Sequence, residues 1–93
     1  MSKVRDLHKK WMKDRETSET QAAEFEIARA LIELRTKAGL TQEQLAERTH
    51  TKQSVVARLE SGRSKPSTQT LQRIARATGT RLKIRFEPES ARR

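Results

Sequence analysis

The chain lacks cysteine, and it also lacks an apolar run long enough to cross a membrane. Without thiols there is no disulfide framework and no thiolate zinc site, which fits a reducing cytoplasm. A membrane helix needs about 18–20 consecutive apolar residues, and the N-terminus has no apolar core of a secretory signal. We therefore expect a cytoplasmic protein that makes no contact with a membrane.

The signatures of catalysis and of metal binding are missing as well. The sequence has no phosphate-binding loop and no nucleophile motif. Its two histidines, His8 and His50, are far apart and have no cysteine near them, so a metal site is not expected. Glu24 and Glu26 fall on different sides of one predicted helix and are expected to be solvated charges. We predict a protein that is not an enzyme and that binds no metal and no cofactor.

Charge dominates the composition, since 35% of the residues are charged and the net charge is +9. Basic groups prevail in residues 1–13 and 34–93, whereas residues 14–33 carry six acidic groups and two basic ones. The basic parts suit a polyanion such as DNA. The acidic block does not, and it favours a basic partner protein.

Apolar residues make up 32% of the chain, so the core is expected to be small and confined to part of it. The spacing of these residues predicts a compact all-α domain over residues 22–79. It would follow an N-terminal extension, residues 1–21, that is partly helical or disordered. It would precede a C-terminal strand and basic tail, residues 80–93.

Local signals divide this domain into helices. An apolar stripe predicts the first helix over residues 22–38, and Gly39 would end it, because glycine enters the left-handed cap conformation cheaply. Thr41 and Gln44 have the spacing of a capping box, so a second helix is expected to begin there. A last helix would follow a basic loop and occupy about residues 66–79.

The helix expected over residues 52–61, with Thr51 as its cap, has the features of a recognition helix for the DNA major groove. A glutamine at its start, Gln53, is placed to bond N6 and N7 of an adenine together. The full set of expected base contacts is Gln53, Ser54, Val55 and Arg58. Phosphate contacts are expected from Thr41, Gln42, Lys52, Arg63, Ser64 and Lys65.

Residues 27–78 resemble the Xre/Cro-type helix-turn-helix family of phage repressors and bacterial regulators. The matching segments are IARALIELRTKAG, LTQEQLAER, KQSVVARLESG and KPSTQTLQRIARATG. The resemblance implies a domain of four to five helices, with Gln42 on phosphate and with Gln53, Ser54 and Arg58 at base-reading positions. It also implies a bacterial or phage origin, a place on the nucleoid, and a structural ion pair between Arg35 and Glu60.

The turn of residues 49–51 departs from the family pattern. Family members place an apolar residue, a glycine and an apolar residue where this chain has Thr49, His50 and Thr51. His50 is therefore expected to take a positive φ, which is uncommon for a residue with a side chain, and the turn is expected to be strained or altered.

A second apolar stripe on the first helix suggests that it packs against two things. This stripe consists of Phe25, Ala28 and Ile32, and the extension adds Leu7 and Trp11. In one interpretation Leu7 and Trp11 fold back onto the stripe. In the other, all five residues contact a partner protein, which the surrounding acidic block favours as a basic one.

The C-terminal tail changes to a two-residue period. Leu82, Ile84 and Phe86 alternate with basic residues, which predicts a strand. A single strand cannot satisfy its own backbone, so we expect it to pair with its twin in a homodimer. The alternatives are that it extends a partner's sheet or is a disordered basic tail.

The layout as a whole resembles HigA-type antitoxins of toxin–antitoxin operons. This resemblance implies a DNA-binding repressor of its own HigBA-type operon, which neutralises a basic mRNA-cleaving toxin of RelE-like fold. Two other hypotheses stay open. The chain would be a stand-alone phage-type or restriction-control repressor bound to operator DNA, or an adaptor that bridges proteins without reading DNA.

Overall fold

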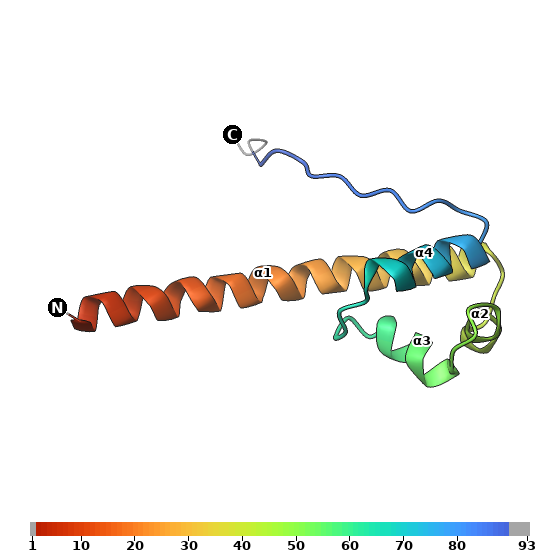
Figure 1. The fold of residues 1–93 in the computed structure, drawn as a ribbon, viewed down its shortest axis with the longest axis horizontal. Coiled ribbons are helices and arrows are strands. Elements are labelled where there is room, and N and C mark those ends of the chain that lie inside the picture. Colours follow the sequence, from red (N-terminus) through yellow and green to blue (C-terminus); the bar gives the residue numbers. More distant parts are fainter. Residues whose placement is uncertain (1, 90–93) are drawn as a thin grey trace.

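The computed structural model of the chain describes the backbone of residues 2–89 and the side chains of residues 17–89. The described part holds four helices, which are α1 (Ser2–Lys37), α2 (Gln42–Arg48), α3 (Gln53–Leu59) and α4 (Thr68–Ala77). Figure 1 shows α1 as a long rod that carries the other helices on its C-terminal half. The helical domain agrees with the all-α expectation.

Helix α1 runs without interruption through residue 21, where the sequence suggested the end of a separate extension. This continuity argues against the first interpretation of the second stripe, whereas contact with a partner protein stays a prediction. About 21 Å of helix separates residue 11 from residue 25, since each residue rises by 1.5 Å. Leu7 and Trp11 therefore do not fold back onto Phe25; their side chains lie outside the described residues.

The core is small and joins all four helices. Its buried residue with the least exposure is Leu45 of α2, at 1%. Around it lies one residue from each of the other helices, so every helix contributes to a single cluster. The cluster comprises Leu31, Leu40, Leu45, Ala46, Val56 and Ile74.

The helix starts follow the sequence signals in two cases out of three. Thr41 caps α2 through the expected capping box, with its hydroxyl accepting from the Gln44 amide at 3.0 Å. Ser67 caps α4 in the same way, by accepting from the amide of Thr70. The expectation for α3 was wrong, because its cap is Lys52, which makes no side-chain cap bond.

The turn between α2 and α3 contains the expected positive φ, 57° at His50. Thr51 does not cap α3, because its hydroxyl lies 3.1 Å from the hydroxyl of Thr49. Its amide closes the turn by donating to the carbonyl of Ala46 at 2.8 Å. The turn is therefore a compact helix end in which a histidine takes the left-handed position.

The expected C-terminal strand is absent from the described residues. Residues 81–89 form an extended segment that passes back along α1 and α4 (Figure 1) and makes no backbone hydrogen bond to another described residue. Ile84 is 64% exposed and Phe86 97% exposed. A strand is defined by its pairing, so one copy of the chain does not display it, and the dimer strand stays a prediction.

Candidate nucleic-acid interface

An ion pair anchors the candidate DNA-binding surface. Arg35 of α1 donates from Nε to Oε2 of Glu60 at 2.6 Å and from a terminal nitrogen to Oε1 at 3.0 Å. A third nitrogen donates to the carbonyl of Leu40 at 2.9 Å. The side chains are only 16% and 5% exposed. The hydrogen bond to Glu60 raises the pKa of Arg35 above its usual range, so this guanidinium stays charged at every ordinary pH.

This ion pair extends outward through two glutamines. Gln42, at the start of α2, donates from Nε2 to Oε1 of Glu60 at 2.9 Å. Gln53, at the start of α3, donates from Nε2 to Oε1 of Gln42 at 2.6 Å. We call this chain of Arg35, Glu60, Gln42 and Gln53 the amide relay. It leads from the part-buried guanidinium to the exposed end of the recognition helix.

The carboxylate of Glu60 fixes the direction of both amides. An ionised carboxylate only accepts hydrogen bonds, so Gln42 has to turn its NH₂ group inward and its carbonyl oxygen outward. Gln53 in turn has to offer its NH₂ group to that oxygen. One N–H and the carbonyl oxygen of Gln53 remain free for a ligand, and this is the donor and acceptor pair that matches adenine in the major groove.

The other expected base contacts lie on α3. Ser54 and Arg58 are exposed, and Val55 is 41% exposed. Val56 is buried in the core and Leu59 packs against it, so these two residues determine which side of this short helix faces outward. All four expected base-reading residues are thus exposed on α3, and Gln53 among them forms the outer end of the amide relay.

The expected phosphate contacts divide into two groups. Thr41 and Lys52 are exposed at the helix starts, and Arg63 and Lys65 are exposed in the loop between α3 and α4. Gln42 is half-buried with both ends of its amide engaged, so a single N–H is left for phosphate.

Ser64 is the exception among the loop residues. Its hydroxyl is buried and has no hydrogen-bond partner among the described residues. It reaches a phosphate only if the side chain turns outward.

Sequence reasoning missed the role of Ser61. Its hydroxyl donates to the carbonyl of Arg58 at 2.7 Å and accepts from the amide of Arg63 at 3.2 Å. It therefore ties the start of the basic loop to the end of α3. A serine at the end of a predicted helix, two residues before a basic residue, was the signal in the sequence.

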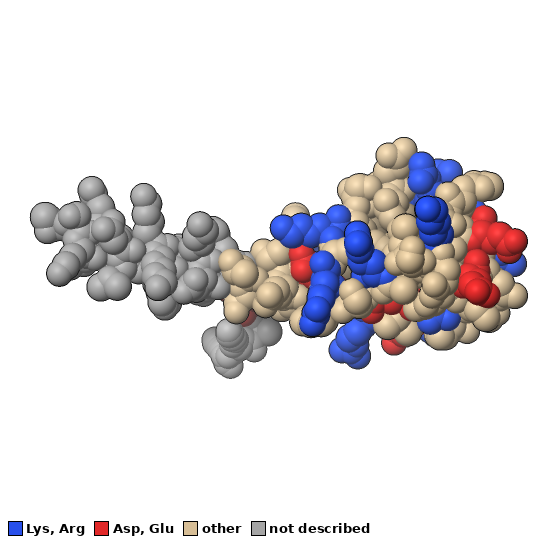
Figure 2. Space-filling model, turned by 90° about the horizontal axis from the view of Figure 1, so that it is seen from below, with Lys and Arg blue, Asp and Glu red and all other residues tan. Residues whose placement is uncertain are grey.

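On this side of the molecule, basic and acidic side chains occupy different parts of the surface. Figure 2 views it from below, on the side of α2 and α3, and shows Lys and Arg side chains spread over the face. Glu side chains are most prominent at one end of the view. A polyanion therefore finds attractive charge over much of the face.

The residues expected to contact a partner protein are only partly available. Phe25 is 54% exposed and Ile32 36% exposed on α1. The inclusion of Ala28 was wrong, because Ala28 is only 4% exposed and its own domain covers it.

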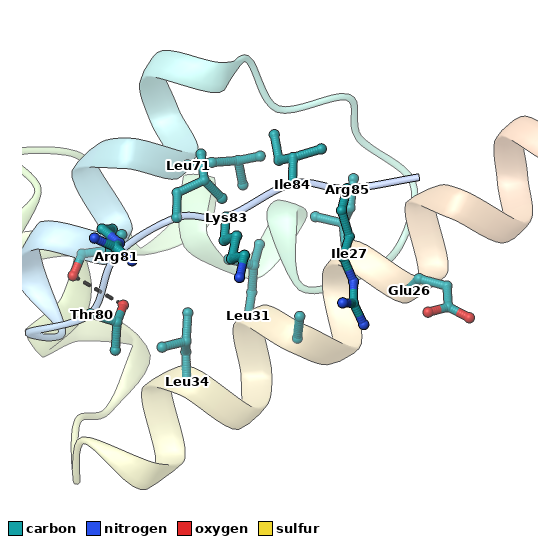
Figure 3. A pocket seen from close by; sticks show the side chains of 13 residues that line it. Glu26, Ile27, Leu31, Leu34, Leu71, Thr80, Arg81, Lys83, Ile84 and Arg85 are labelled. Carbon is teal, nitrogen blue, oxygen red and sulfur yellow. Dashed lines mark hydrogen bonds between the residues drawn. The ribbon is translucent and has the colours of Figure 1, made fainter. Parts of the chain in front are cut away.

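A groove of about 610 Å³ lies between α1, α4 and the C-terminal segment, and aliphatic side chains such as Leu31 and Leu71 form its walls. Figure 3 shows Lys83 and Arg85 pointing from the segment toward α1, whereas Ile84 points away from it.

Among the described residues no group of His, Cys, Asp or Glu is arranged to hold a metal ion. None of the described helices is long and apolar enough to span a membrane.

Comparison with known proteins gives relatives of one kind. Human endothelial differentiation-related factor 1 is 39% identical over 72 residues, which cover 75% of this chain and 49% of that protein. Putative multi-protein-binding factor 1 of Yarrowia lipolytica is 38% identical over 60 residues, which cover 64% and 40%. Multiprotein-bridging factor 1a of Arabidopsis thaliana is 38% identical over 58 residues, which cover 62% and 41%.

The chain spans about half of the length of these relatives, or less. They come from eukaryotes and their names mention no antitoxin, so they support neither the HigA-type prediction nor a bacterial origin. Residues 31–84 match the family described as helix-turn-helix, in agreement with the Xre/Cro-type resemblance. The chain belongs to the helix-turn-helix family.

Proposed function

We propose that the chain is a sequence-specific DNA-binding regulator whose helix α3 enters the major groove. The observation that carries this proposal is the amide relay, which holds Gln53 in one orientation before any DNA arrives. A side chain that is already ordered loses less entropy on binding. Its free donor and acceptor match adenine, so we assign Gln53 to an A·T pair.

The remaining residues have separate roles in this proposal. Ser54, Val55 and Arg58 contact neighbouring base edges from the exposed side of α3. Lys52, Arg63 and Lys65 hold the phosphates on either side, which fixes the register of the protein without reading sequence.

The proposal is tested by selecting bound sites from a random duplex library and measuring affinities for the selected site. Gln53→Ala should cost about 1–3 kcal/mol and relax the preference at one A·T position. Gln72→Ala is the matched control, because Gln72 is an exposed glutamine on α4 outside the relay. Failure to enrich any sequence, or an unchanged preference in the Gln53 variant, would contradict sequence-specific reading.

A second function, the bridging of DNA to another protein, is favoured by α1. Exposed Phe25 and Ile32 lie within the acidic block of this helix, and two of the relatives are named for binding or bridging several proteins. The partner we propose is a basic protein, since complementary charge guides association. In the antitoxin form of this function, the partner is a mRNA-cleaving toxin of RelE-like fold.

Capture of partners on the immobilised full chain separates these forms. A basic RelE-like protein whose mRNA cleavage stops on binding supports the antitoxin form, and another basic protein supports general bridging. Glu26→Lys with Glu33→Lys should weaken either complex, because both carboxylates are exposed on α1. If these reversals leave the complex intact, the acidic surface of α1 is not the docking site.

A further inference from the structure

Phe25 makes an unusually close approach to the loop that carries the phosphate contacts. Gly62 starts this loop with a φ of +80°. A Cβ atom added to Gly62 would lie 2.6 Å from Cε1 and 3.4 Å from Cγ of the Phe25 ring, and closer still to Cδ1. The ring therefore rests directly on the backbone of Gly62, although 37 positions separate the two residues.

The ring contributes little to the core. Phe25 is 54% exposed, and it belongs neither to the buried cluster nor to the half-buried residues packed against that cluster. A phenylalanine that served stability alone would bury most of its area. Its ring approaches the loop closely at Gly62, so its effect should be found there.

The loop is held at two adjacent points. On one side the Ser61 hydroxyl ties the end of α3 to the amide of Arg63. On the other side the Phe25 ring blocks movement of Gly62 toward α1. Arg63 and Lys65 follow directly and are exposed. The path of the backbone at Gly62 thus determines where these two cations stand relative to α3.

We infer that Phe25 is a positioning residue for DNA binding, which acts through Gly62 on the phosphate contacts of Arg63 and Lys65. Its role in affinity rests on the proposed DNA-binding function. Its effect on the loop does not, because the contact exists in the free protein. A ligand that covers the exposed part of the ring would in this way alter DNA affinity without contacting DNA itself.

Substitution of Phe25 with alanine tests this role against the selected DNA site. Phe25→Ala should weaken binding about tenfold and reduce the slope of log affinity against log salt by about one, as expected for a lost phosphate contact. The preference for bases should stay unchanged. Phe25→Tyr keeps the ring and should restore wild-type affinity and slope. Gln21→Ala, at an exposed residue of the same helix that has no assigned contact, is the control and should leave affinity and slope unchanged.

A double-mutant cycle shows whether the effect passes through Gly62. Gly62→Ala places a methyl group against the ring, so Phe25→Ala should relieve part of the damage and the two changes should not be additive in DNA affinity. Additive losses, or a Phe25→Ala variant with wild-type affinity and salt slope, would overturn the inference.

Amide hydrogen exchange in the free protein separates this inference from the proposed function. Phe25→Ala should speed exchange at Arg63 while leaving exchange in the core at Leu45 unchanged. If the wild-type chain binds no DNA, the proposed function fails, and fast exchange at Arg63 still supports the positioning of the loop. Unchanged exchange at Arg63 overturns the positioning role whatever the chain does with DNA.

Discussion

At the scale of single residues, Glu60 is the centre of the candidate interface. Its two oxygens accept three hydrogen bonds, two from Arg35 and one from Gln42. These bonds connect α1, the start of α2 and the end of α3. The residue that orients the reading side chain Gln53 is therefore also the residue that neutralises a part-buried guanidinium, so stability and recognition depend on the same carboxylate.

Replacing Glu60 by glutamine tests the structural part of this double role. Glu60→Gln should lower the free energy of unfolding by about 3 kcal/mol, because Arg35 loses its counter-charge in a mostly buried setting. Glu87→Gln is the matched control, since Glu87 pairs with Arg85 at 3.3 Å with both side chains 72% exposed. It should cost less than about 1 kcal/mol. Urea denaturation measures both, and equal losses would contradict the structural role of the Arg35 pair.

At Ser64, removal of a polar group should increase stability instead of lowering it. Its buried hydroxyl has no partner in the described part of the chain, so Ser64→Ala should raise the free energy of unfolding by about 1 kcal/mol. The same change should weaken DNA binding if the hydroxyl turns outward to a phosphate. Ser61→Ala removes a bonded hydroxyl from the same loop and should be destabilising. Thermal denaturation that ranks both variants below wild type would show that Ser64 is not unpaired.

At the scale of elements, α2 and α4 end in the same way. Thr49 and Thr78 each donate their hydroxyl to carbonyls of the preceding turn, and each lies about 3 Å from the hydroxyl of a threonine two positions later. The residue between the threonines is His50 in one case and Gly79 in the other, both at positive φ. The motif is thus threonine, left-handed residue, threonine, with a histidine where glycine is the relaxed choice.

Exchanging the middle residues of these two motifs should produce opposite effects. His50→Gly should stabilise the fold by about 1 kcal/mol. The left-handed conformation costs a residue with a side chain about 1–2 kcal/mol, and glycine avoids this cost but loses more backbone entropy on folding. Gly79→His should destabilise it by a similar amount, because a Cβ at Gly79 meets nothing within 4 Å and only the backbone cost remains. Both are measured by urea denaturation. A destabilised His50→Gly variant would mean that the imidazole makes a contact worth more than the strain.

The elements also show what the sequence determines on its own. The capping box of Thr41 and Gln44 and the positive φ of His50 are local, so the spacing of a few residues was enough to predict them. The ion pair of Arg35 with Glu60 spans 25 positions and came from the family resemblance instead. Residues 13–21 have no apolar period, so the continuous α1 was not expected there.

Contacts between distant residues escaped prediction for a physical reason. The approach of the Phe25 ring to Gly62 depends on how two elements pack, and neither residue carries a local sign of it. The orientation of Gln53 depends likewise on a carboxylate seven positions further on. The identities of the site residues were thus accessible from the sequence, whereas the network that orders them required the fold.

At the scale of the whole molecule, the C-terminal segment has no strand partner among the described residues. Residues 81–89 leave their backbone unpaired within the described chain, and Ile84 and Phe86 expose most of their surface to solvent. An extended segment with free edges and exposed apolar residues is a template for pairing with another strand. A second copy of this segment is the partner we expect, since antiparallel pairing across a two-fold axis satisfies both copies at once.

If this dimer forms, the oligomeric state should depend on protein concentration, and DNA binding should depend on the number of half-sites. Sedimentation should show a monomer–dimer equilibrium, and Ile84→Lys with Phe86→Lys should shift it to monomer. Lys83→Gln, in the same segment but pointing toward α1 (Figure 3), should leave it unchanged. The wild type should bind two half-sites about 34 Å apart with a single transition, since the spacing of recognition helices in a dimer follows one turn of DNA. A chain that stays monomeric at all concentrations and binds one half-site as tightly as two would rule out pairing through this segment.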